Sequence, residues 1–225
     1  MADEEIFHGN NEAQSLQQLR AKLRQGLMVG GVVLLAICAG AGGWAWQRHS
    51  LHLAQQKASA RYCTALQLQN NATNREKAAQ EFADLAAHAP DGVRSYAAMR
   101  LADYRARTGQ LGEANTLWQQ VIHDRKADPA LQGMARFLVL NMALQHGSLP
   151  PAELQKGFEA LIKDNSSWSG LAREGLVALD LQPGATQAQQ AEAKRLLGEI
   201  VHAPDTSAAL RERASLVLQI LGEAG

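Results

Sequence analysis

Residues 96–123, YAAMRLADYRARTGQLGEANTLWQQVIH, decide the fold of this chain. They predict two amphipathic helices joined at Gly109, because apolar residues recur three and four positions apart on both sides of that glycine. The pattern returns along the chain. Gly109, Gly147, Gly184 and Gly222 follow one another at spacings of 38, 37 and 38 residues, which predicts a turn at each of them. Twelve residues before the first three stand Ala97, Ala135 and Ala172, and eight before them stand Leu101, Val139 and Leu176.

The second helix of each unit repeats independently. One large apolar residue marks this helix in each unit, and these residues follow one another at spacings of 36, 40 and 39: Phe82, Trp118, Phe158 and Leu197. Three and four positions after each of them stand further apolar or small residues. We interpret these four residues as core positions. Two series with a common period predict a stack of antiparallel helix pairs that share a core, since one pair is too small to bury its own apolar face.

The expected fold is therefore all-α, a solenoid of about four helical hairpins with a terminal capping helix. No segment shows the alternation of apolar and polar residues that is typical of strands. The periodicity and the breaker residues predict helices over 51–69, 74–89, 93–108, 112–123, 130–146, 151–163, 168–181, 186–202 and 206–221.

A different pattern marks the N-terminal part. The segment 27–46, LMVGGVVLLAICAGAGGWAW, contains no charged residue. Twenty helical residues span about 30 Å, the hydrocarbon thickness of a bilayer. The sequence thus predicts a tail over 1–26, a transmembrane helix over 27–46 and a helical-repeat domain over 47–225. The flanking charges favour a cytoplasmic N-terminus only weakly.

A cleaved signal peptide is the alternative to a membrane span. Its cleavage site would be Ala39-Gly40-Ala41. Against this alternative, 26 residues precede the apolar run, and the run continues past that site to Trp44 and Trp46. A lipoprotein signal ending at Cys38 is disfavoured because Ile37 is too large for the position before an acylated cysteine.

Composition argues against several classes of function. The 22 basic and 22 acidic residues give a formal net charge of zero, so nothing favours binding to a phosphate backbone. Phosphate-binding glycine loops, nucleophile elbows and zinc-protease signatures are absent from the sequence. We therefore expect no catalytic residue, no cofactor, no metal site and no small-molecule substrate. His88, His123 and His202 fall at predicted helix ends, where a cation interacts favourably with the last carbonyls.

A partly basic strip is the one candidate binding surface. It lies on the first helix of a hairpin, and in a solenoid the first helices are expected to line the concave face. It is a candidate for receiving an acidic peptide or an extended segment of a partner, and the alternative is an ordinary solvated helix face. The strip consists of Arg94, Tyr96, Arg100, Asp103 and Arg107.

The segment from Tyr96 to Ala114 resembles the first helix and turn of a tetratricopeptide repeat, with Trp118 at a usual apolar position of the second helix. The period is a few residues longer than is usual in that family. The order of tail, span and repeats resembles the YfgM-like family of ancillary Sec translocon subunits. In sequence this resemblance rests on DEEIF near the start, the glycine-rich span ending in WAWQRH, and KASARYCTALQL.

The second resemblance implies a single-pass protein of the bacterial inner membrane with a cytoplasmic N-terminus and a periplasmic repeat domain. It implies a scaffold that associates with the SecYEG channel and with a periplasmic chaperone of the prolyl-isomerase type. Two alternatives remain: a general cell-envelope assembly scaffold without a link to secretion, and a sensor that signals through its cytoplasmic tail. The shortness of the tail counts against the sensor.

Overall fold

A computed structural model describes residues 46–164, 167–204 and 206–223. The chain divides into two compact units, Met1–Ala54 and Gln55–Gly225. The predicted tail and all of the predicted membrane span except its last residue lie outside the described residues. Within the described ranges, no helix is long and apolar enough to cross a membrane. In the first unit residues 46–54 are helical, and the side chains of Trp46, Leu51 and Leu53 are exposed.

The second unit is built from helices wherever it is described. Its elements are the helical residues 55–69, η1 (Ala72–Asn74), α2 (Arg75–His88), α3 (Val93–Arg107), α4 (Leu111–His123), α5 (Pro129–His146), α6 (Pro151–Lys163), α7 (Ser169–Asp180), α8 (Gln187–His202) and α9 (Ala208–Glu223). The helices predicted from residue 74 onward are confirmed, with every end within two residues of its predicted place.

Local signals in the sequence explain where several helices begin and end. At α5 the carboxylate of Asp128 accepts a hydrogen bond from the amide of Ala130, and Pro129 occupies the first helical position, where no amide is needed. Thr186 and Gln189 form a capping box at the start of α8. Gly147 ends α5 in the left-handed conformation at φ 62°, which glycine adopts without a steric penalty.

The turn glycines are confirmed at three of the four predicted positions. Gly109, Gly147 and Gly184 have positive φ between the two helices of a pair. The prediction for Gly222 is wrong, because this residue lies inside α9 and has no positive φ. Equal spacing placed Gly222 in the series, but α9 is longer than α7 and continues past the position at which α7 ends.

The four residues interpreted as core positions are buried. Phe82, Trp118, Phe158 and Leu197 are each at most 4% exposed. The predicted small residues Ala97, Ala135 and Ala172 are fully buried, and each lies on the first helix of a pair. A methyl group at these places lets neighbouring helices approach closely. Both repeated series are therefore positions at which the packing between helices restricts the size of the side chain.

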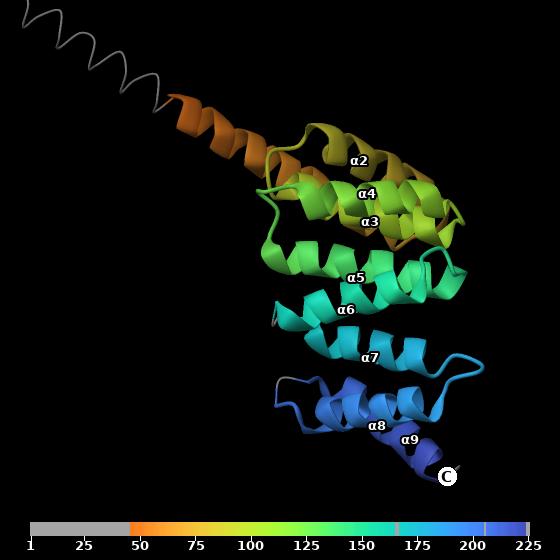
Figure 1. Cartoon of the computed structure of the whole chain (residues 1–225). Helices are drawn as coiled ribbons and strands as arrows, with labels where there is room; N and C mark the ends of the chain where they lie inside the picture. Colours follow the sequence, from red (N-terminus) through yellow and green to blue (C-terminus); the bar gives the residue numbers. More distant parts are fainter. Residues whose placement is uncertain (1–45, 165–166, 205, 224–225) are drawn as a thin grey trace, which may run out of the picture. The chain divides into compact units, whose positions relative to one another are not determined.

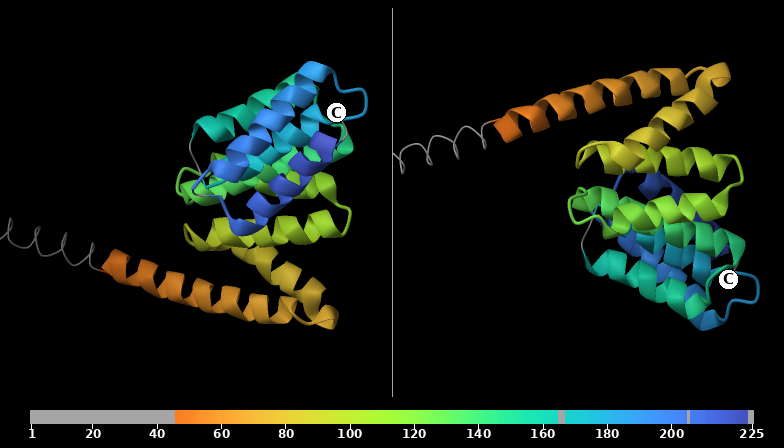
Figure 2. Two further views of the ribbon diagram at one scale, coloured as in Figure 1. Left: turned by 90° about the horizontal axis from the view of Figure 1, so that it is seen from below. Right: turned by 90° about the horizontal axis from the view of Figure 1, so that it is seen from above.

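Successive helices pack against one another from α2 to α9, so each hairpin is stacked on the next (Figure 1). The first helices α3, α5 and α7, and the capping helix α9 that takes the next first-helix place, also contact one another in order. Among the described residues α2, α4, α6 and α8 have no such contacts with one another. The first helices therefore form the more closely spaced layer, as expected for the inner layer of a curved stack. Figure 2 shows the stack from its α9 end and from its α2 end.

Candidate interaction surface

The predicted strip lies on the exposed side of the layer formed by α3, α5, α7 and α9. We call this side the first-helix face. Equivalent positions on it are counted from one buried residue in each helix: Ala97, Ala135, Ala172 and Leu210. Six residues later in each helix stand Asp103, Asn141, Ala178 and Leu216, all of which are half-buried or exposed. The first-helix face thus carries a different side chain at this place in each of these four helices.

Four of the five predicted strip residues lie together on α3. At about 100° per residue, Tyr96, Arg100, Asp103 and Arg107 project within about 60° of one another. Arg107 pairs with Asp103 at 2.9 Å, one turn away. This pairing leaves Arg100 and the exposed Tyr96 as side chains of the strip that are available to a partner.

Arg94 is placed elsewhere, on the opposite side of α3. Its guanidinium pairs with Asp91 at 2.8 Å and with Asp124 at 3.4 Å, and the hydroxyl of Ser95 donates to Asp124 at 2.8 Å. Partial burial acts to raise the pKa of Asp124, but hydrogen bonds from the Lys126 amide and Ser95, together with Arg94, bring it below its usual range. Arg94 therefore joins the loops of neighbouring hairpins and does not extend the strip.

An open polar groove of about 450 Å³ runs beside the strip. Its wall is formed by the end of the first helix of the unit, the start of α2 and the C-terminal half of α3. We call it the arginine groove, and it is lined by Gln69, Asn70, Arg75, Arg100, Asp103, Tyr104, Arg107 and Thr108.

The arginine groove carries an excess of positive charge. Three guanidinium groups line it, and the only carboxylate in its lining is Asp103, which Arg107 already neutralises. Arg75 is exposed and has no ion-pair partner among the described residues. The Nε of Arg100 donates to the hydroxyl of Tyr62 at 3.3 Å, and the Tyr62 ring packs edge-on against buried Phe82. Tyr62 thereby positions Arg100 beside the groove without taking its charge.

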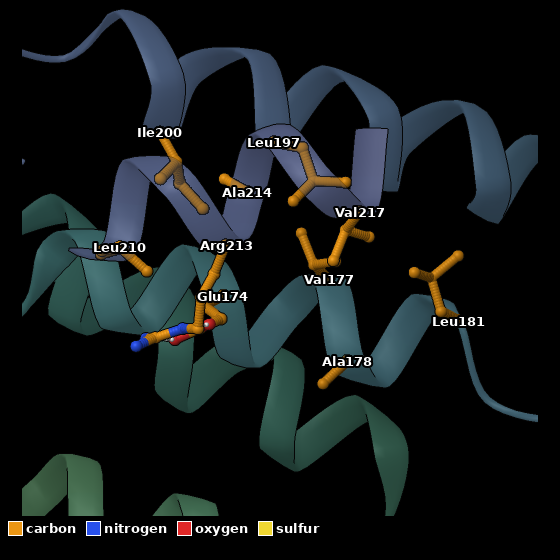
Figure 3. A pocket seen from close by; sticks show the side chains of 10 residues that line it. All are labelled: Glu174, Val177, Ala178, Leu181, Leu197, Ile200, Leu210, Arg213, Ala214 and Val217. Carbon is orange, nitrogen blue, oxygen red and sulfur yellow. Dashed lines mark hydrogen bonds and ion pairs between the residues drawn. The ribbon is translucent and has the colours of Figure 1, made fainter. Parts of the chain in front are cut away.

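A second groove, of about 210 Å³, lies between α7, α8 and α9 (Figure 3). In contrast to the arginine groove, its wall is almost entirely aliphatic. We call it the apolar groove, and it is lined by Val177, Ala178, Leu181, Leu197, Ile200, Leu210, Ala214 and Val217. The remaining two lining residues, Glu174 and Arg213, form a two-pronged ion pair in which both hydrogen bonds are 2.9 Å long.

His88, His123 and His202 occupy the last turns of α2, α4 and α8, as expected. The ring Nδ1 of His123 donates to the carbonyl of Gln119 at 2.7 Å, and His202 donates to Gly198 at 2.7 Å. Each ring thus folds back onto the last turn of its own helix and adds a second donor to a carbonyl there. In the described part of the chain, no group of three or more His, Cys, Asp or Glu side chains is placed to hold a metal ion.

Sequence reasoning found three of the eight residues that line the arginine groove and missed the other five, Arg75 among them. Arg75 follows η1 directly, and its sequence neighbours give no sign of a site. A signal was nevertheless available, because the first helices of successive hairpins run parallel and their C-terminal ends lie side by side. The turn after residue 69 is therefore expected beside the end of α3. The apolar groove had no comparable signal, since its lining residues resemble the rest of the core.

The family model of the tetratricopeptide repeat-like domain matches residues 23–174 of this chain. The match covers the helical residues 55–69, η1, α2 to α6 and the first half of α7. No curated protein and no solved structure matches the chain. Repeat domains of this kind are typical protein–protein interaction modules without catalytic activity.

Proposed function

This chain belongs to the tetratricopeptide repeat-like domain family, and we propose from that premise that it is a membrane-anchored adaptor of the Sec translocon. In this proposal it is an ancillary, non-enzymatic subunit that links the SecYEG channel to a periplasmic prolyl-isomerase-type chaperone. Its N-terminus lies in the cytoplasm, its span crosses the bacterial inner membrane, and its repeats lie in the periplasm.

The observation that carries the adaptor role is the first-helix face. The first helices of three successive hairpins and the capping helix α9 present exposed side chains on one layer, which is a surface suited to a partner protein. The charges on this surface are local: the arginine groove has an excess of guanidinium groups, while the whole chain has a formal net charge of zero. Local charge of this kind selects among partners and speeds their encounter.

The link to secretion rests on sequence resemblance. The order of an acidic tail, one apolar span and a helical-repeat domain resembles the YfgM-like subunits, as do the segments DEEIF, WAWQRH and KASARYCTALQL. An adaptor of the channel has to be held at the membrane beside it, and an apolar segment of about 20 residues supplies an anchor of the required length.

Site-specific crosslinking in cells tests this proposal. A photo-crosslinking phenylalanine derivative replaces Tyr96, which is 45% exposed on the first-helix face. The matched control carries the same group at Lys156, which is exposed on α6, in the other layer. Membranes are solubilised in a mild detergent after irradiation, and the crosslinked partners are identified by mass spectrometry.

We expect Sec channel subunits or a periplasmic chaperone to be crosslinked from position 96 and not from position 156. A reproducible set of cell-envelope assembly proteins in their place would refute the link to secretion and support the general envelope scaffold. Absence of any crosslink specific to position 96 would refute the first-helix face as the binding surface.

A further inference from the structure

The C-terminal end of α7 differs in charge from the ends of its neighbours. Each of the helices α2 to α6 and α8 has a basic residue in its last turn, where a cation interacts favourably with the helix dipole. The last turn of α7 has none, and its last residue is the acidic Asp180. The carboxylate of Asp180 therefore lies at a helix end that disfavours negative charge.

The equivalent positions of the other hairpins show which charge is missing. Four residues before each turn glycine, the first helices α3, α5 and α7 have Arg105, Ala143 and Asp180. Five residues before each large core residue, the second helices α4, α6 and α8 have Glu113, Glu153 and Glu192. In the α3–α4 hairpin the residues at these two positions form an ion pair, with Nε of Arg105 3.2 Å from Oε2 of Glu113. In the α7–α8 hairpin both positions carry a carboxylate.

Asp180 is left without a partner at this place. It is half-buried, and among the described residues it accepts no hydrogen bond and forms no ion pair. Burial, and after it the charge of Glu192, raise the pKa of the Asp180 carboxyl above its ordinary value. Glu192 itself pairs with Arg195 at 2.6 Å. The ionised Asp180 thus lacks the positive charge that Arg105 supplies in the α3–α4 hairpin.

An open pocket of about 270 Å³ leads to Asp180. Six residues, 181–186, join α7 to α8, whereas three residues, 108–110, join α3 to α4. The longer turn projects from one edge of the stack (Figure 1), and together with the start of α6 it forms the walls of the pocket. Asp180 is the one charged residue of the described chain that lines it. We call it the turn pocket, and its polar and proline lining consists of Pro151, Gln155, Asp180, Gln182, Pro183 and Gln189.

The cation that this lining fits best is a guanidinium group. A carboxylate binds guanidinium through two parallel hydrogen bonds, and guanidinium is less strongly hydrated than the ammonium group of lysine, so it enters a half-buried site more readily. Gln155 donates to Glu159 through Nε2 at 2.8 Å, which leaves its Oε1 to accept from a further N–H of the ligand. An engineered cavity of about 150 Å³ holds a benzene ring, so about 270 Å³ is enough for the planar guanidinium group.

An arginine within a protein chain suits the turn pocket better than free arginine does. The free amino acid brings a carboxylate of its own, and among the described residues the pocket has no positive charge to receive it. Within a protein that carboxylate is part of a peptide bond, so only the guanidinium charge remains to be matched.

We propose that the turn pocket is a second partner-binding site, which receives an arginine side chain of a partner protein and pairs its guanidinium group with Asp180. The partner's arginine takes the role that Arg105 has in the α3–α4 hairpin. This inference goes beyond the proposed adaptor function and does not depend on the link to secretion. It gives the chain a place for one partner while the first-helix face is occupied by another.

Binding of a capped arginine tests this proposal directly. The probe is N-acetylarginine N-methylamide, and the matched probe is the corresponding citrulline compound, which has nearly the same shape but no charge. The full chain is studied in detergent with ¹³C-labelled alanine and leucine methyl groups. Two-dimensional NMR then follows the methyl signals of Ala152, Leu179 and Ala185, which line the turn pocket.

We expect the arginine compound to shift these signals to saturation and to bind about tenfold more tightly than the citrulline compound, because hydrogen bonds between charged groups are the stronger ones. Asp180→Asn keeps the size of the side chain and lowers the affinity for the arginine compound to that for the citrulline compound. The control is Asp164→Asn, an exposed aspartate outside the pocket that pairs with Arg136, and it leaves the affinity unchanged. Asp180→Asn removes an unfavourable charge, so it is expected to fold, and its urea midpoint at pH 7 is expected to be no lower than that of the original chain.

Equal affinity for the arginine and citrulline compounds would overturn the proposal, as would equal affinity of the original chain and Asp180→Asn for the arginine compound. Equally tight binding of the corresponding lysine compound would overturn the assignment to arginine. The experiment contains no component of the Sec channel, so its failure leaves the proposed function standing. Absence of Sec crosslinks at position 96, in turn, leaves this inference standing.

Discussion

The sharpest prediction about packing concerns Gly175, a buried glycine on α7. A Cβ at this position would lie 2.5 Å from Cε1 and 2.6 Å from Cζ of Phe158. Phe158 is fully buried and also packs against Phe137, with ring centroids 6.5 Å apart, so its ring can move only by displacing other core side chains. The substitution Gly175→Ala therefore forces helices α6 and α7 apart.

The expected size of the effect follows from two opposing contributions. Overpacking of a well-filled core destabilises by roughly 1–3 kcal/mol, and the contact with a fully buried ring places this case near the upper end. Alanine favours a helix over glycine by about 1 kcal/mol, which offsets part of that loss. We expect Gly175→Ala to lower the free energy of unfolding by about 2 kcal/mol.

The chain offers a matched control at Gly198, a glycine inside α8 with nothing within 4 Å of the position that a Cβ would take. Gly198→Ala has the same chemistry and the same gain in helix propensity but no clash. It is expected to raise the free energy of unfolding by about 0.5–1 kcal/mol. Urea unfolding of the full chain in detergent, followed by far-UV circular dichroism, measures both.

A third variant tests the cause of the loss. In a Phe158→Leu background the ring is gone, so adding Gly175→Ala is expected to cost less than it does in the original chain. An equal cost in both backgrounds would show that the ring is not responsible. A gain in stability for Gly175→Ala similar to that of Gly198→Ala would refute the tight packing at this crossing altogether.

Three further substitutions have definite expected outcomes. Trp168→Phe keeps an aromatic ring but loses the 2.7 Å hydrogen bond from Nε1 to the carbonyl of Ala130. It should lower the free energy of unfolding by about 1 kcal/mol, and an unchanged urea midpoint would contradict this. Because the folded-state pKa of Asp124 is lowered, its ionised form stabilises the fold above about pH 4, and this contribution is lost as the pH falls through the folded-state pKa. Between pH 5 and 2.5, thermal unfolding should therefore show a smaller loss of stability in Asp124→Asn than in the original chain. Parallel curves of stability against pH for the two proteins would refute this. Thr186→Ala removes the capping box with Gln189 and should cost about 1 kcal/mol, measured by the same urea titration, whereas Thr186→Ser should retain most of that stability.

Sequence patterns predict most of the repeat domain because they act over short distances. The apolar periodicity and the breakers locate each helix from 74 onward to within two residues. The turn glycines have the positive φ that their spacing predicts at Gly109, Gly147 and Gly184. Equal spacing fails at Gly222, since a period marks equivalent positions but does not say that the chain must turn at each of them.

The candidate site was predictable only in part. Helical geometry alone places Tyr96, Arg100, Asp103 and Arg107 on one face, and the same geometry puts Arg94 on the other side of α3, beside Asp91 and Asp124. The predicted strip wrongly included Arg94 with the residues on the other side of α3, because its members were chosen for their charge and not for their position around the helix.

The sequence by itself determined that this chain is a stack of helical hairpins, because the spacing of apolar residues, caps and breakers is local information written in consecutive residues. It also determined which residues anchor the core, since each repeat has to fill the same space with a large side chain. Only the tertiary structure decided that the turn at 69–75 supplies Arg75 to the groove of α3, and that α7, α8 and α9 leave an apolar groove. Those outcomes depend on the distance between helices and on which charges find partners, and both are fixed by contacts between residues far apart in the chain.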